Sequence, residues 1–265
     1  MEHVRVNGLR IAYRRAGAGP PLLLLHGILQ DSRAWRWQTE ALSEQFTVLA
    51  WDAPGCGSSD DPPATYRMPD YADRLAEFVE VVGVSRLHVL GLSLGAVLAL
   101  ELYRRHPRLP RSLILSSAYA GWAGSLPADE VARRREHGLR EAGLPARDVV
   151  PRWLPGIFTE NAPREMVEIT AAMMSDFHPG GYRTMTNAVA EADLRDVLPT
   201  IEVPTLLLYG AVDRRSPLAV AEDLHRRIPN STLAVLDGVG HLCNVEAADR
   251  FNAQVLQFLA AVSDT

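Results

Sequence analysis

Residues 87–105 read LHVLGLSLGAVLALELYRR and contain the motif that decides the fold, Gly91-Leu92-Ser93-Leu94-Gly95. The apolar run Leu87–Leu90 before it is typical of a buried strand, and residues 96–105 after it show the pattern of a buried helix. A strand that turns sharply into a helix at such a motif exposes the serine, and the helix start offers backbone N–H groups to an anion. We therefore predict that Ser93 is a nucleophile; the alternative is a glycine-rich helix start.

Further apolar runs of strand length lie on both sides of this motif, at residues 22–25, 47–50, 113–116, 205–209 and 232–236. Helical patterns separate many of them, as at residues 71–82, where apolar side chains share one face between Asp70 and Gly83. Alternation of strands and helices predicts an α/β fold with a doubly wound, mostly parallel sheet. Asn7-Gly8, between alternating apolar and polar residues, predicts an opening β-hairpin.

One long segment, residues 122–198, interrupts this alternation. It contains helix-like patches separated by Pro and Gly, and no convincing strand pattern. We predict an inserted helical cap, or lid, at 122–198 within a core formed by residues 1–121 and 199–265. The aromatic residues of the segment, Trp122 and Trp153 among them, could line a pocket or hold the lid helices together.

Composition limits the possible partners. The 265 residues carry 27 Lys plus Arg against 32 Asp plus Glu, a net charge of −5, which argues against nucleic acid. The two cysteines form neither a disulfide framework nor a zinc pattern, and the eight histidines include no HExxH pair. No dinucleotide fingerprint is present, so we expect neither a metal nor a cofactor.

The chain start and its hydropathy predict where the protein works. Residues 1–5 lack the basic start and apolar stretch of a secretory signal, and the apolar run at residues 22–25 is far shorter than the roughly 20 residues of a membrane span. We therefore expect a cytoplasmic protein with no membrane partner, and a monomer or a homodimer.

A serine hydroxyl is a weak nucleophile and needs a histidine base oriented by a carboxylate. Asp213 follows the predicted strand at 205–209, and His241 follows the one at 232–236. The order Ser93, Asp213, His241 is the order of α/β-hydrolases and differs from those of chymotrypsin and subtilisin. Singly, Asp213 could be a turn-capping carboxylate and His241 a loop histidine; together with Ser93 they predict a catalytic triad.

The oxyanion of such a reaction needs two backbone N–H donors. We predict that Leu94, directly after the nucleophile, and Ile28, in the turn after the strand at 22–25, supply them. Gly27 permits the close backbone turn. His26 is interpreted as a hydrogen bonder that fixes this loop rather than as a second base.

The turn His26-Gly27, the loop at 52–59, the nucleophile motif, Asp213 and Gly240-His241 together resemble the α/β-hydrolase superfamily. Within it, the motif around Ser93 and the stretches at 152–158, 241–246 and 251–253 are similar to 3-oxoadipate enol-lactonases. This resemblance implies a hydrolase of a small-molecule carboxylic ester or lactone. It also suggests Trp153 as a lid residue over the substrate, although a structural role fits equally, and we add His26 and Trp122 as candidate substrate-binding residues.

The sequence departs from those lactonases at two places. After Asp52, where they commonly carry an Arg-Gly-His series, this chain has Ala53-Pro54-Gly55-Cys56. Arg214-Arg215 after Asp213 is unusual for the family; these side chains could bind a substrate carboxylate or lie solvated at the surface. Cys56 and Cys243 are interpreted as small buried packing groups.

The sequence therefore predicts a serine hydrolase that cleaves an ester or lactone through a Ser-His-Asp triad and an acyl-enzyme. The same triad would also serve a carbon–carbon bond hydrolase or a cofactor-free perhydrolase. A different class of protein, a small-molecule receptor or signalling protein on the hydrolase fold, is the third alternative. A serine at position 93 disfavours the superfamily members that use an aspartate nucleophile.

Overall fold

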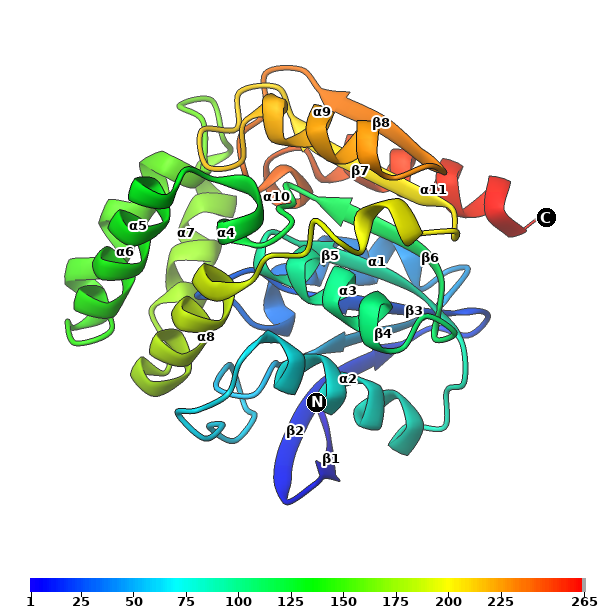
Figure 1. Cartoon of the computed structure of the whole chain (residues 1–265), viewed down its shortest axis with the longest axis horizontal. Helices are drawn as coiled ribbons and strands as arrows, with labels where there is room; N and C mark the ends of the chain where they lie inside the picture. Colours follow the sequence, from blue (N-terminus) through cyan, green and yellow to red (C-terminus); the bar gives the residue numbers. More distant parts are fainter. Residues whose placement is uncertain (264–265) are drawn as a thin grey trace.

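The fold is built on one eight-stranded sheet, seen in a computed structural model that describes residues 1–263 (Figure 1). The strands lie in the order β1-β2-β4-β3-β5-β6-β7-β8. Their bounds are β1 Glu2–Val6, β2 Leu9–Ala16, β3 Pro21–Leu25, β4 Thr47–Trp51, β5 Leu87–Leu92, β6 Pro110–Ser116, β7 Thr205–Gly210 and β8 Ser231–Leu236. Every predicted strand is therefore present, with ends that differ from the prediction by at most three residues.

The sheet is mostly parallel. β1 and β2 form the predicted hairpin, in which Asn7 and Gly8 take φ angles of 43° and 86°, and β2 pairs antiparallel with β4. All other pairs, from β4 through β3 and β5 to β8, are parallel. Because parallel strands end at the same edge, the loops after β3, β5, β7 and β8 lie close together.

Helices cover both faces of the sheet (Figure 1). One face packs against α2 (Met68–Val81), α3 (Leu94–Arg105) and α9 (Leu218–Arg227), and the other against α1 (Arg36–Leu42) and α11 (Ala248–Ser263). Within β3 the leucines alternate: Leu23 and Leu25 join the first core, and Leu22 and Leu24 join the second. This two-sided burial explains why the strand sequences are continuously apolar, and it confirms the predicted doubly wound fold.

Helix α2 begins earlier than the sequence pattern predicts. Asp70 is not the residue before the helix; it lies in the first turn and accepts a hydrogen bond of 2.7 Å from the backbone N–H of Arg67. Pro69 occupies one of the first two helical positions, where its missing N–H costs nothing. Met68, the first residue of the helix, is buried and lies three positions before Tyr71 on the same face, but Pro69 and Asp70 between them hide this first turn from the sequence pattern.

Five helices lie between β6 and β7, and we call them the lid. They are α4 (Trp122–Ser125), α5 (Ala128–Glu141), α6 (Ala146–Ile157), α7 (Arg164–Met174) and α8 (Pro179–Glu191). In Figure 1 they form the green and yellow group at the left of the sheet. The remaining short elements are the 3-10 turns η1 (Ser32–Trp35) and η2 (Leu198–Thr200) and helix α10 (Cys243–Glu246).

Polar contacts join the lid to the core at several points. Arg33 Nη1 lies 2.8 Å from Asp176 Oδ2, and Nδ1 of His178 lies 2.6 Å from Asp61 Oδ1. Leu242 donates its backbone N–H to the carbonyl oxygen of Ile157 at 3.1 Å. Among residues 1–263 there is no helix with the length and apolar character needed to cross a membrane.

Candidate active site

Ser93 lies at the turn between β5 and α3 in an unusual backbone conformation. Its φ and ψ are 54° and −111°, a region that residues with a Cβ rarely adopt. The turn is tight, because a Cβ on Gly95 would overlap the carbonyl oxygen of Leu25, and one on Gly91 would overlap that of Gly95. The two glycines of the motif are therefore required by the close approach of the backbone to itself.

Asp213 and His241 meet beyond the ends of β7 and β8. His241 Nδ1 lies 2.8 Å from Asp213 Oδ2, and the ring and the carboxylate are both buried. The other carboxylate oxygen of Asp213 accepts the backbone N–H groups of Arg215 at 2.8 Å and Ser216 at 2.9 Å. With its Nδ1–H donated to Asp213, the ring keeps Nε2 available as a base.

The surroundings of Asp213 favour its charged form. Burial works to raise the pKa of this carboxyl. The charge of His241, its hydrogen bond and the N–H groups of Ser216 and Arg215 outweigh burial, so the pKa lies below its usual value. Asp213 is therefore suited to orient the histidine and to stabilise its protonated form.

Ser93 and His241 line the same small cavity, together with Ile28, Trp153 and Ile157. Its free volume is about 20 Å³, little more than a water needs. Within the described chain the Ser93 hydroxyl forms no hydrogen bond with His241, and such contacts often tighten only when substrate binds. The lid therefore leaves almost no room for a substrate in this conformation.

The predicted oxyanion donors lie beside this cavity. Leu94 is the first residue of α3, directly after Ser93, and Ile28 lines the cavity from the turn after β3. Gln30 Oε1 accepts the backbone N–H of Gly27 at 2.9 Å and fixes this turn. Gln30 is a positioning residue that sequence reasoning missed, since a glutamine three residues past a strand carries no distinctive signal.

His26 holds the loop and does not line the cavity of Ser93. Its Nδ1 lies 2.8 Å from the carbonyl oxygen of Gly27, and its Nε2 accepts the backbone N–H of Ala53 at 3.1 Å. Burial lowers its pKa, partly opposed by the Gly27 hydrogen bond and by Asp52 and Asp31, which keeps the ring neutral. Both ring nitrogens are engaged with the backbone, which agrees with the interpretation of His26 as a hydrogen bonder that fixes this loop. Its role in substrate binding stays a prediction.

The side chain of Trp153 is held in the lid by a hydrogen bond and by contact with an arginine. Its indole N–H donates to Glu141 Oε2 at 2.9 Å, and the hydroxyl of Tyr182 donates to the same oxygen at 2.7 Å. The guanidinium of Arg215 lies 3.8 Å from the centre of the Trp153 ring. Glu141, a buried lid carboxylate, was missed by sequence reasoning because it occurs among the many charged residues of α5.

Three further residues that the sequence analysis singled out lie outside the cavity of Ser93. Trp122 lines a neighbouring cavity, where the guanidinium of Arg134 lies 5.9 Å from the centre of its ring. Arg214 is exposed, as a solvated arginine would be, whereas Arg215 is partly buried against Trp153. Sequence reasoning did not distinguish these two adjacent arginines, but in the structure Arg214 is exposed and Arg215 is partly buried.

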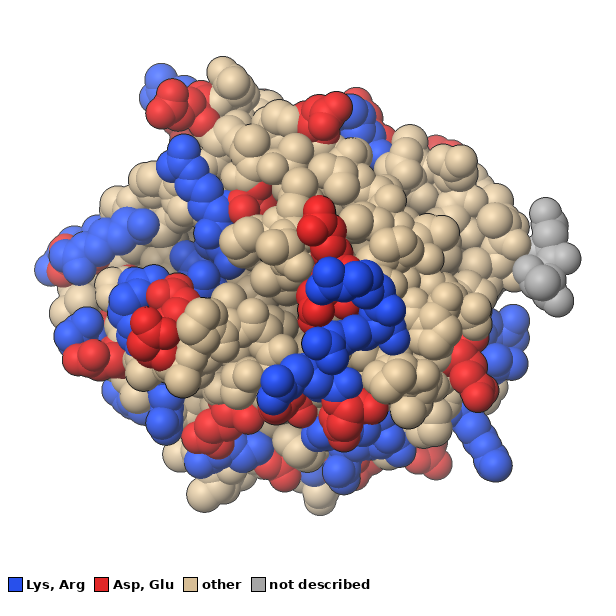
Figure 2. All heavy atoms as spheres, turned by 45° about the horizontal axis from the view of Figure 1, so that its top comes forward, with Lys and Arg blue, Asp and Glu red and all other residues tan. Residues whose placement is uncertain are grey.

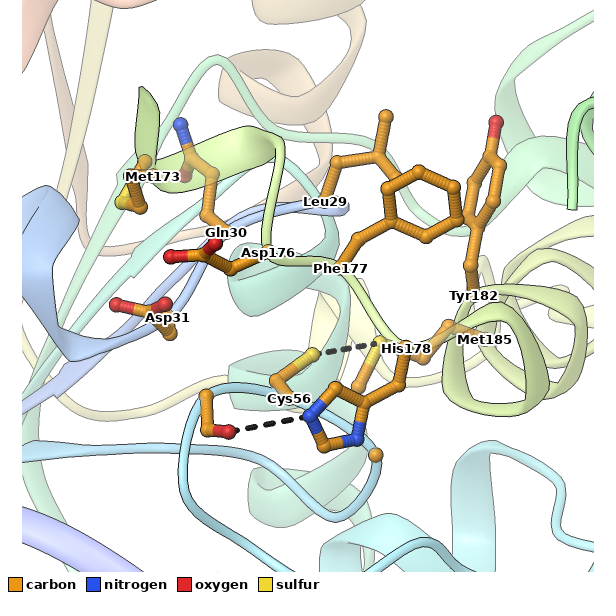
Figure 3. A pocket seen from close by; sticks show the side chains of 12 residues that line it. Leu29, Gln30, Asp31, Cys56, Met173, Asp176, Phe177, His178, Tyr182 and Met185 are labelled. Carbon is orange, nitrogen blue, oxygen red and sulfur yellow. Dashed lines mark hydrogen bonds between the residues drawn. The ribbon is translucent and has the colours of Figure 1, made fainter. Parts of the chain in front are cut away.

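The cysteines are buried, as predicted. Cys56 faces a small cavity between the core and the lid, with its sulfur 3.7 Å from the sulfur of Met185 and His178 nearby (Figure 3). Burial raises the pKa of Cys56 well above its usual value, and that of Cys243 to about 12. Both thiols are therefore protonated and inert at neutral pH. Residues 1–263 hold no cluster of three or more metal-ligating side chains.

The sequence profile of the alpha/beta hydrolase family matches residues 22–254. The chain belongs to this family. As a member of the alpha/beta hydrolase family it is a hydrolase, and relatives support this: it is 26% identical, over 250 residues and 93% of each chain, to the (E)-2-((N-methylformamido)methylene)succinate hydrolase of Acinetobacter baylyi.

Solved structures of alpha/beta hydrolases superpose closely on the chain. A thermophilic esterase from Thermogutta terrifontis, with malate bound, gives a TM-score of 0.92 at 27% identity and covers 99% of both chains. The enol-lactonase from Burkholderia xenovorans gives 0.88 at 26% identity, with 98% of this chain and 100% of that chain covered. The resemblance to enol-lactonases is thereby confirmed.

Proposed function

We propose that the chain is a serine hydrolase that cleaves a carboxylic ester or lactone of a small molecule. The observation that carries the proposal is the Asp213–His241 hydrogen bond, which leaves Nε2 of His241 as a base at the cavity that Ser93 lines. The backbone of Ser93 adds support, since strain of this kind is typical of an exposed nucleophile.

The reaction proceeds in two steps. His241 Nε2 takes the proton of Ser93 as its Oγ attacks the carbonyl carbon, and the N–H groups of Leu94 and Ile28 stabilise the oxyanion. The C–O bond then breaks, and His241 returns the proton to the leaving alkoxide, which in a lactone stays tethered to the acyl group. Water, deprotonated by His241, then attacks the acyl-enzyme, the bond between the acyl carbon and the Ser93 oxygen breaks, and His241 returns the proton to that oxygen as the acid leaves.

Two solved structures that resemble the chain support ester or lactone hydrolysis within the hydrolase class. The solved structures with TM-scores of 0.92 and 0.88 are described as an esterase and an enol-lactonase. The cavity of about 20 Å³ next to Ser93 indicates that the lid must shift before any such substrate binds.

The proposal is tested with a panel of p-nitrophenyl esters, small lactones and 3-oxoadipate enol-lactone, incubated with the protein and with Ser93→Ala. We expect turnover of at least one substrate, and a loss in kcat on the order of 10⁶-fold in Ser93→Ala. The matched control is Ser43→Ala, which removes a hydroxyl whose one hydrogen bond among residues 1–263 goes to the carbonyl oxygen of Glu40. Turnover that survives in a folded Ser93→Ala variant contradicts the proposal.

A further inference from the structure

A cavity of about 260 Å³ lies on the lid side of the loop that follows β7. Four arginines line it, Arg133 and Arg134 from α5 and Arg214 and Arg215 from the loop, and its lining includes no acidic residue. Figure 2 shows basic side chains gathered around the hollow at the left of this face. Glu130 and Glu141 lie directly behind this lining, and the four arginines still leave the cavity with an excess of positive charge although the chain as a whole is acidic.

The arginines of this cavity fall into two pairs. Arg133 and Arg134 share Glu130, with nitrogen–oxygen distances of 2.7 and 2.6 Å. Arg214 and Arg215, by contrast, form no ion pair with any described residue. Two positive charges at the cavity wall therefore lack an anionic partner.

Arg215 is held in place although it has no anionic partner. Its guanidinium lies over the ring of Trp153 at 3.8 Å, and its backbone N–H donates to Asp213 at 2.8 Å. Burial and the nearby charge of Arg134 lower the pKa of Arg215, whereas Tyr119 raises it. A partly buried cation beside other cations is costly unless an anion joins it, so this position gains most from a negatively charged ligand.

The same cavity borders the catalytic centre. Trp153 lines both the basic cavity and the space of about 20 Å³ next to Ser93. A groove of about 580 Å³ at the end of α6 is lined by His241 and by Arg214. Both volumes adjoin the space next to Ser93 through shared lining residues, and Arg214 lines both of them. A substrate too large for that space can therefore extend toward Arg214.

We propose that the basic cavity is a subsite for an ionised carboxylate carried by the substrate, with Arg215 as its principal partner and Arg214 as the second. The preferred substrates are then half-esters or lactones related to dicarboxylic acids. A guanidinium matches a carboxylate with two parallel hydrogen bonds, which favours this group over a point-like anion. The inference deepens the proposed function, because it names the substrate class of the Ser93 site.

The test compares two esters of equal size that differ in charge. Monoethyl adipate carries a terminal carboxylate, and ethyl adipamate carries a neutral amide of the same shape; the glutarate and succinate pairs vary the chain length. Release of ethanol is followed for each. In the wild-type protein we expect kcat/KM for the carboxylate ester to exceed that of its amide by about 10- to 100-fold at one chain length.

Variants identify the partner of the carboxylate. Arg215→Gln is expected to bring this ratio close to one, and Arg215→Lys to give an intermediate value, because it keeps the charge and loses the planar fork. Arg164→Gln is the matched control, since it also removes a lid arginine that lies at the surface and pairs with Glu168. Thermal unfolding shows whether each variant is folded. If Arg215→Gln does not fold, the ratio in Arg214→Gln, a change at an exposed residue, tests whether the cavity binds the carboxylate.

Three results overturn the inference: a wild-type ratio near one at every chain length, a ratio that survives in the arginine variants, or a loss in Arg164→Gln as large as in Arg215→Gln. If no ester is cleaved, the proposed function fails, and calorimetric titration with adipate and glutarate still decides the subsite. Binding that is lost in Arg215→Gln supports it. No binding, unaffected binding or equally tight binding of inorganic phosphate contradicts it.

Discussion

Replacing Ser93 by glycine is expected to make the protein more stable while it abolishes hydrolysis. With φ and ψ at 54° and −111°, Ser93 holds its Cβ in a region that only glycine adopts freely. The Ser93 side chain makes no hydrogen bond among residues 1–263, so little is lost with it. Strain at Ser93 thus opposes folding and fixes the position of its hydroxyl.

The size of the effect follows from two opposing contributions. A residue in such a sparsely populated region costs about 1–3 kcal/mol. Glycine loses more conformational entropy on folding, at a cost of about 0.5–1 kcal/mol. The net gain is therefore about 1 kcal/mol, which corresponds to a rise in Tm of about 2–4 °C for a protein of this size.

Ser93→Ala is the matched control, because alanine removes the hydroxyl and keeps the strained Cβ. The difference in stability between Ser93→Gly and Ser93→Ala isolates the backbone strain from the loss of the hydroxyl. Thermal and urea unfolding of the wild type and both variants supply the comparison. A glycine variant that is no more stable than the alanine variant would refute the claim that strain is stored at this turn.

Three further predictions concern the surroundings of the site. The pKa of Asp213 is lower in the folded than in the unfolded protein, so its carboxylate contributes stability that is lost as the pH falls through the folded pKa. The difference in Tm between the wild type and Asp213→Asn should therefore narrow on acidification. A difference in Tm that stays constant with pH contradicts this. Gly95→Ala should lose about 2–3 kcal/mol in urea unfolding because its Cβ overlaps Leu25, unlike Gly143→Ala, which has space. Thiol reagents at pH 8 should label neither cysteine in the folded protein and both in urea; rapid labelling of the native protein would show that the thiols are accessible.

The sheet and the order of the site residues could be predicted because both depend on local patterns. Buried parallel strands are continuously apolar, as in Leu22–Leu25, and the turn at Ser93 requires glycines on both sides in sequence. Asp213 and His241 lie three and five residues after the ends of β7 and β8, so the topology of a parallel sheet brings them to one edge without any knowledge of distant contacts.

The lid contacts could not be predicted, because they depend on which helices pack together. Glu141 and Trp153 are 12 residues apart on different helices, and their hydrogen bond exists only once α5 and α6 pack against α8. Arg215 differs from Arg214 only in the direction of its side chain, which sequence does not encode locally. The loop-fixing role of His26 could be inferred from the sequence, but its partner Ala53 could not, because Ala53 lies on another loop.

The central claim is that Ser93 is the acyl nucleophile, and covalent trapping tests it most directly. The protein is incubated with an organophosphate such as paraoxon, and the adduct is located by mass spectrometry after proteolysis. We predict one adduct per chain, on Ser93, with loss of ester turnover in proportion to labelling. An adduct on another residue, or full turnover in a protein labelled stoichiometrically at Ser93, would contradict the account.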